Sequence, residues 1–293
     1  MRTSLIKSRN IDNSFMSEAD IRSRAPAAFS LTKADHLTDR YQSLQTSSLL
    51  PLMADYGYFP VQAAQTRPRR LSDMLKAHAS VSEHRHHLIS FARAEDLQRP
   101  DRPEVTLFNS HNGSGAVRLF AGIYRMICSN GIVIGSGTEA RIYHSKSAMS
   151  GFEDMLRQVV TTVPEVLATM ERMKGVTISY PQALQMAEKA VSLRWNRFDK
   201  HLDKYDVMHP KGSFYTLDTI IDTLRAKRGD DTENDLYTIF NIIQENVMRG
   251  NTFVKSVTTS EPHGIMRKAR PVNSVKAHTD LNAKLWAAVK ECI

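Results

Sequence analysis

Polar residues at the end of an expected strand are the first candidates for chemistry. The segment LFNSHNGSG, residues 107–115, offers amide, hydroxyl and imidazole groups beside two glycines. A phosphate loop of the Walker type ends in Gly-Lys-Ser/Thr, because its lysine reaches the β and γ phosphates. The chain has Arg118–Phe120 at that place, so we interpret the glycines as turn residues. We predict that the polar side chains near this turn form one edge of a ligand site: Asn109, His111, Asn112 and Asn130.

Two arginines follow within an apolar run. Arg118 and Arg125 must each reach solvent, an acid or a phosphate, because burying an unpaired arginine is costly. On a strand their odd spacing places them on opposite faces, unless Gly122 forms a bulge and resets the register. On a helix they would share a face. Structural ion pairing is the alternative to an anion site. We expect both arginines to line a groove with Arg141 and Lys146.

Histidines and one cysteine suggest metal binding or nucleophilic catalysis. The sequence EHRHH at 83–87 places several imidazoles close together, but no acidic residue at ligand spacing completes a metal set. Cys128 follows an apolar run and is interpreted as a buried thiol, and no Gly-x-Ser-x-Gly motif occurs. We therefore expect no catalytic residue, no metal and no cofactor.

A basic segment near the C-terminus is the clearest indication of an anionic partner. Between residues 249 and 276 there are six Lys/Arg and one acid, Glu261. The stretch 194–198 interleaves arginine with Trp and Phe, and 67–70 forms another basic tip. Cations that neutralise phosphates and aromatics that stack on bases hold single strands without reading their sequence. We predict nucleic-acid contacts at Arg249, Lys255, Arg267, Lys268 and Arg270.

The elements that position these residues follow from apolar periodicity. Strands are expected within 58–70, over 87–93 and 102–109, and in two runs after 116 that are separated by a hairpin turn at Ser129–Gly131. Helical spacing also fits 116–128, so strand and helix both stay open there. Helices are expected in six other segments: 33–57, 145–173, 181–202, 213–231, 232–250 and 278–293.

This order of elements predicts an α+β fold. An antiparallel sheet with a hairpin, flanked by helices, forms the N-terminal half, and the C-terminal half is mainly helical. We expect a flexible arm over 1–33, a core domain over 34–178, and a helical region over 179–293 that packs on the core. Within that last region, 251–277 is expected to be an irregular basic loop.

Composition limits the classes of protein that fit. The chain has 293 residues, 41% hydrophobic and 8% aromatic, which is typical of a globular protein. Its formal net charge of +8 favours polyanionic partners. Two cysteines far apart in the sequence indicate a reducing compartment, and no apolar run is long enough to span a membrane. The N-terminus does not resemble a secretory signal, so we expect a cytoplasmic protein.

Three segments carry a resemblance to a known family. LFNSHNGSGAVRLFAGIYRMICSNGIVIG, SKSAMSGFEDML and VNSVKAHTDLNAKLWAAV resemble the phage/plasmid-like proteins catalogued as domain of unknown function 932, over roughly residues 35–290. Members occur on phages and plasmids, so the resemblance implies a mobile element and no particular chemistry. The family's usual turn has Asp where this chain has Asn112, which argues against a metal-binding acid there. The order of elements is also similar to the core of single-strand annealing proteins.

The leading hypothesis is a DNA-binding protein of a mobile element. It would bind single-stranded DNA as a homo-oligomer and assist annealing or recombination. A second hypothesis is an inhibitor or modulator that binds a host defence or repair protein through its basic surface. A metal-dependent nuclease is the third hypothesis, and no sequence motif supports it.

Overall fold

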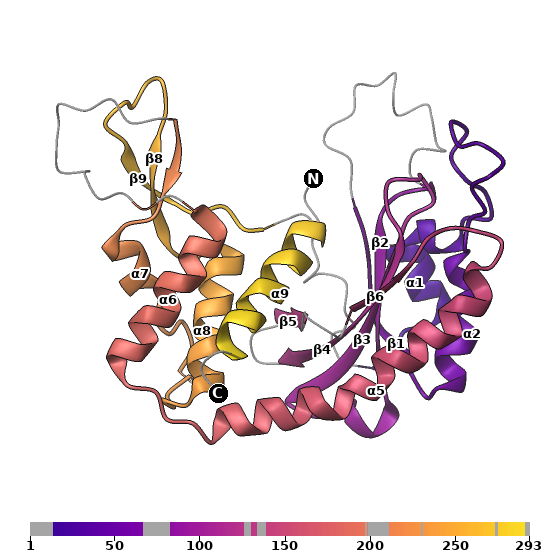
Figure 1. Ribbon diagram of the computed structural model, residues 1–293, viewed down its shortest axis with the longest axis horizontal. Coiled ribbons are helices and arrows are strands. Elements are labelled where there is room, and N and C mark those ends of the chain that lie inside the picture. The colour runs from indigo at the N-terminus through magenta and orange to yellow at the C-terminus, as the bar shows by residue number, and fades with distance from the viewer. Residues whose placement is uncertain are drawn as a thin grey trace. The chain divides into compact units, whose positions relative to one another are not determined.

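The chain divides into two compact units. A computed structural model describes residues 14–66, 83–125, 130–133, 139–196, 198, 211–229, 231–272 and 275–290 (Figure 1). The first unit comprises the residues up to Leu167 together with Asn273–Val275, and the second comprises Ala168–Val272 and the residues from Lys276. The division falls inside the long helix α5 (Ala148–Lys174), earlier than the expected division after residue 178.

The first unit is built on an antiparallel sheet, as the sequence predicts. Its strands pair in the order β1-β2-β3-β4-β5, and β6 also pairs with β4. The strand interpretation of the stretch after residue 116 is therefore confirmed for Val117–Arg125. The bounds of the strands are β1 (Phe59–Gln65), β2 (His87–Ala92), β3 (Asp101–Asn109), β4 (Val117–Arg125), β5 (Asn130–Val133) and β6 (Glu139–Ile142).

The register of β4 corrects two expectations. Pairing with β3 runs without interruption from Asp101↔Arg125 to Phe108↔Arg118, so Gly122 is not a bulge. Arg125 pairs with Asn130, so β5 already begins at Asn130 and the connection lies earlier than Ser129–Gly131. Without a bulge, positions 118 and 125 fall on opposite sides of the pleat. The groove expected for both arginines stays a prediction, because the side chain of Arg125 lies outside the described residues.

One face of this sheet is filled by aliphatic side chains. Ile89, Leu107 and Leu119 are cross-strand partners on successive strands, and all are 0–1% exposed. Cross-strand partners share a face because the pleat alternates side chains between the two faces. Leu49 and Met53 of α2 (Thr46–Asp55) are also fully buried. The apolar residues whose alternation predicts the strands therefore form the core of this unit.

The helices of the first unit begin earlier in the chain than expected. Helix α1 (Glu18–Arg24) starts at a capping box in which Ser17 and Asp20 each accept the other's backbone N–H. Short helices η2 (Pro26–Phe29) and η3 (Ala94–Asp96) complete the unit with α2 and α5. Residues 14–33 are packed, with Ile21 at 2% exposure, so an arm could only precede residue 14, outside the described residues. Residues 33–45 are not helical, and the expected helix is limited to α2.

The second unit is mainly helical and centres on α8 (Leu236–Arg249). Twelve of the fourteen residues of α8 are buried, and its N-cap Asp235 accepts the N–H of Thr238. Around it lie α6 (Tyr180–Trp195), α7 (Leu217–Thr223) and α9 (Val275–Lys290). The mainly helical C-terminal half is confirmed, although the helix expected over 213–231 is limited to α7.

A small sheet replaces the loop expected at 251–277. Strands β7 (Gly212–Phe214), β8 (Phe253–Val257) and β9 (Ile265–Lys268) form an antiparallel sheet in that order. The expectation of an irregular segment is wrong for β8 and β9. Its physical reason is pairing: the alternation in FVKSV becomes a strand only because IMRK, across the turn at Gly264, completes its hydrogen bonds.

Gly250 connects α8 to this sheet through a left-handed conformation. Its φ is +69°, and a Cβ there would collide with the backbone of Ala269. Gly250→Ala should therefore lower the free energy of unfolding by about 2 kcal/mol or more, from strain plus steric clash. Gly229, which has ordinary backbone and open space around it, provides the control Gly229→Ala. Urea denaturation of both variants checks this, and equal effects would contradict it.

Candidate functional site

The polar turn after β3 is buried and hydrogen-bonded. Asn109, Ser110 and His111 are each 0% exposed. The Asn109 amide donates to the Leu44 carbonyl and the Thr46 hydroxyl, both at 2.9 Å, and its oxygen accepts the N–H of Ser110 at 2.7 Å. This side chain therefore joins the end of β3 to the start of α2. Ser110 Oγ and His111 Nε2 are buried in the same turn and have no hydrogen-bond partner among the described residues.

Histidines extend this network. His87 and His111 lie 2.7 Å from the hydroxyls of Thr46 and Ser43, respectively. The two rings are 5.4 Å apart between centroids, and His144 follows at 6.3 Å from His111. Loop, strand and helix termini that are distant in sequence thus share one set of hydrogen bonds.

Burial keeps these imidazoles neutral. Desolvation lowers the pKa of His111 to about 3, and the nearby imidazole of His87 lowers it further. Desolvation likewise lowers the pKa of His87 and of His144 to about 4. A neutral ring has one donor and one acceptor, which suits hydroxyl partners that can also act as either.

The histidines at 83–87 take up separate structural contacts. His84 Nε2 lies 2.9 Å from the Thr32 hydroxyl, and the His86 ring stacks on Phe108 at 5.2 Å with Nε2 2.6 Å from Ser114 Oγ. In the part of the chain that the structure describes, no three His, Cys, Asp or Glu side chains are grouped to hold a metal ion.

A pair of arginines lies at one edge of the first sheet. Arg118 of β4 is directly opposite Arg141 of β6. The Arg118 guanidinium lies 4.8 Å from the Phe120 ring centroid, and that of Arg141 lies 6.0 Å from the Tyr143 ring centroid. Tyr143 is 67% exposed, and Lys146 is exposed nearby in sequence. Like charges directly opposite repel one another unless neighbouring groups offset their charge.

Several predicted residues fall outside the described parts. The side chains of Arg125 and Asn130 belong to this group, as do Cys128 and the basic tip at 67–70. Asn112 is described and partly exposed, and its oxygen accepts from Ser114.

The β8–β9 hairpin brings cations and apolar side chains together on one face. Phe253 pairs with Lys268, and Lys255 pairs with Met266. Partners across a ladder share a face, and so do residues two apart, so these four side chains alternate on one surface. Phe253 is 49% exposed and Met266 is 45% exposed. We call these four residues the hairpin surface, and we include the exposed Arg267, which pairs with Val254 and so lies on the other face of the same hairpin.

Charges around the hairpin differ in their partners. Arg249 pairs with the buried carboxylate of Glu245 at 3.4 Å. Arg270 is exposed, and its carbonyl accepts from Arg194, whose guanidinium lies 4.3 Å from the Trp195 ring centroid. Within the described residues, Arg267, Lys268 and Arg270 make no ion pair. These three are the cations of the segment most available to a ligand.

The apolar members of the hairpin surface were not predicted. Phe253 and Met266 lie in a segment expected to be irregular, so they were not assigned a face. The apolar residues Phe253, Val254 and Val257 within the short run FVKSV were the available signal.

A family comparison agrees with the resemblance read from the sequence. The family described as Domain of unknown function (DUF932) matches residues 34–286. The chain belongs to this family. The matched range includes the polar turn, the arginine pair and the hairpin surface of this DUF932 protein.

Two relatives from Escherichia coli (strain K12) align with nearly the whole DUF932 chain. UPF0380 protein YfjQ is 27% identical over 272 residues, covering 89% of this chain and 85% of the relative. UPF0380 protein YafZ is 26% identical over 269 residues, with the same coverage of both chains. No solved structure matches. None of the helices within the described ranges is both long and apolar enough to cross a membrane.

The neutral histidines make stability depend on pH. Unfolded histidine gains a proton near pH 6.5, whereas folded His87 and His111 stay neutral down to about pH 4 and 3. The unfolded state therefore binds more protons in that interval, and stability falls as the pH falls below 6.5. At pH 5 the loss should reach about 2 kcal/mol per histidine.

Urea denaturation at pH 7.5, 6 and 5 measures this loss. His111→Gln should reduce the pH dependence, provided that it folds at pH 7.5. His36→Gln removes an exposed imidazole and serves as the matched control. An unfolding free energy that stays constant from pH 7.5 to 5 would show that the histidines are not held neutral.

Proposed function

We propose that this protein binds single-stranded nucleic acid, with DNA favoured, through the hairpin surface. The observation that carries the proposal is the pairing of Phe253 with Lys268 and of Lys255 with Met266 on one face. This pairing alternates cationic and apolar groups along the strands.

Such alternation fits the chemistry of a single strand. Phosphates require cations along the backbone, and unpaired bases expose flat apolar faces that stack on aromatic rings. Phe253, exposed by 49%, offers a ring for stacking. Arg267 and Lys268 are exposed and without an ion pair inside the described ranges, so a phosphate meets no competing carboxylate there. A duplex would bury its base faces and could use only the cations.

The arginine pair of the first unit supports an additional anion contact. Arg118 and Arg141 oppose each other beside the exposed ring of Tyr143. An anion bound between them would relieve their repulsion. This pair would be a contact region of the first unit alone, separate from the hairpin surface of the second.

Annealing or recombination on a mobile element is the finer part of the proposal. Its support is the resemblance to phage/plasmid-like proteins and the similarity of element order to single-strand annealing proteins. The competing hypothesis is that the same basic surface binds an acidic host protein. A failure to bind nucleic acid would favour that hypothesis.

Removing charge from the hairpin surface should weaken binding and its salt dependence together. Arg267→Gln/Lys268→Gln should reduce the slope of log K against log salt by roughly 0.7 for each lost phosphate contact. Fluorescence anisotropy with labelled oligo-dT and with a duplex, across a salt series, measures this slope. Lys284→Gln removes an exposed charge from α9 and should leave the slope unchanged. No binding at low salt, or an unchanged slope in the double variant, would show that the hairpin surface does not contact the phosphates.

Removing the exposed ring should have a different effect. Phe253→Ala should weaken oligo-dT binding by about 1–3 kcal/mol, the usual value of one base stacked on an aromatic ring. The salt slope should stay the same because no charge is lost. Phe253→Leu keeps apolar volume without a flat ring and should also bind more weakly. Equal affinity for all three proteins in the same anisotropy assay would argue against stacking at this position.

A further inference from the structure

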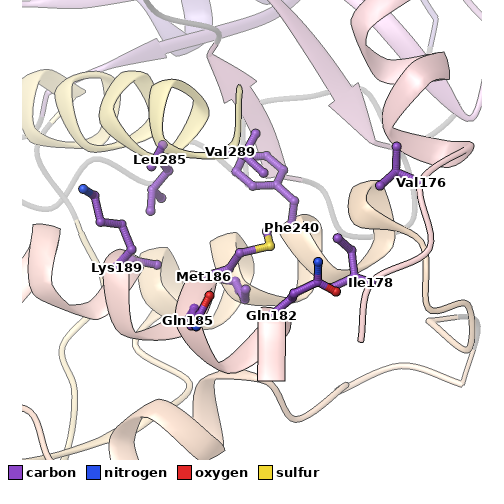
Figure 2. A pocket seen from close by; sticks show the side chains of 12 residues that line it. Val176, Ile178, Gln182, Gln185, Met186, Lys189, Phe240, Leu285 and Val289 are labelled. Carbon is purple, nitrogen blue, oxygen red and sulfur yellow. The ribbon is translucent and has the colours of Figure 1, made fainter. Parts of the chain in front are cut away.

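A cavity in the second unit has the shape and lining of a small-molecule site. It has a volume of about 400 Å³ and lies between α6 and α9, over residues of α8 (Figure 2). Figure 2 shows Met186 and Phe240 at its centre, with Leu285 and Val289 of α9 above them. This volume falls in the range of pockets that enclose small ligands.

Two of the helices that line the cavity, α8 and α9, are joined by contacts that do not involve a ligand. The Gln244 amide of α8 donates to Asn282 of α9 at 2.8 Å, and both side chains are 0% exposed. Trp286 of α9 packs edge-on against Phe240, with centroids 5.7 Å apart. A buried hydrogen bond between neighbouring helices fixes their spacing, because breaking it leaves unpaired polar groups. The α8 and α9 sides of the cavity are therefore fixed relative to each other without a ligand.

Charge at the rim indicates what the cavity would take. Lys189 lies at one end in Figure 2, and Ile178 with Gln182 lies towards the other. None of the twelve lining residues is acidic, and Lys189 is exposed. An anionic head could therefore meet the Lys189 ammonium while an apolar tail covers Met186 and Phe240.

We propose that this cavity binds a small amphiphile with an unbranched apolar tail and one carboxylate. The carboxylate lies at Lys189, and the tail runs between α6 and α9 towards Ile178. The proposal is independent of nucleic-acid binding. An apolar helix of another protein is the competing occupant, and it would not require a carboxylate beside Lys189.

Trp286 provides a direct readout, because it contacts Phe240 in the cavity wall. In a Trp195→Phe background, Trp286 is the remaining tryptophan of the chain. Decanoate added to this protein should change Trp286 fluorescence saturably, and calorimetry should give the same Kd. Octanoate should bind roughly tenfold more weakly, because it buries two fewer methylenes. Absence of saturable binding by decanoate in both measurements would overturn the proposal.

Substitutions at the rim and the wall test the orientation. Lys189→Gln should weaken decanoate about fivefold and leave decanol unaffected, since only the carboxylate uses the charge. Ala288→Phe fills the cavity from a partly exposed position and should abolish binding of both. Ala287→Phe adds the same ring on the exposed side of α9 and is the matched control. Equal decanoate affinity in Ala288→Phe and Ala287→Phe would place the ligand elsewhere.

Discussion

The first unit depends on satisfying one buried amide. Asn109 is fully buried, so the oxygen and nitrogen of its side-chain amide have lost their hydrogen bonds to water. Both atoms need partners within the protein to offset that loss. The Asn109 amide finds these partners on other segments of the chain. It links the end of β3 to the residues at the start of α2, and the hydroxyl of Thr46 continues the link to the imidazole of His87 on β2. An unpaired amide at this position would cost about 1–3 kcal/mol, a large part of the stability of a domain. The fold therefore explains the presence of Asn109 in this stretch, whereas Ser110 Oγ and His111 Nε2 lack hydrogen-bond partners among the described residues.

Arginines in the two units show how burial decides the role of a charge. Arg102 is 1% exposed and binds Glu104 through two nitrogens at 2.9–3.0 Å, so its charge is neutralised inside the first unit. Arg267 and Arg270 are exposed and have no acid partner among the described residues. A buried pair such as Arg102–Glu104 contributes to a defined packing, and an exposed cation contributes to a field that attracts anions. Sequence alone does not distinguish these situations.

Prediction from the sequence succeeded where the signal is local. Alternating β-branched and aromatic residues identified β2 and β3, left strand and helix both open for β4, and apolar periodicity identified α6 and α8. It failed where a residue depends on a distant partner. The register of Gly122, the burial of Asn109 and the pairing of β8 with β9 are each set by contacts with another segment. The side of the hairpin on which Phe253 lies is set by its pairing with Lys268. Phe253 was therefore not identified from the sequence as part of a binding surface.

The net charge of the protein is concentrated rather than spread. The segment 249–272 contains five Lys/Arg and one acid, Glu261, and so accounts for +4 of the formal net charge of +8. Arg249 is committed to Glu245, a buried acid outside the segment. The outward charge therefore rests mainly on Arg267, Lys268 and Arg270. A field from three cations on or beside one hairpin acts over about a Debye length, roughly 8 Å at physiological salt. It can attract a phosphate chain to the hairpin, but only the apolar groups between the cations can tell exposed bases from a duplex.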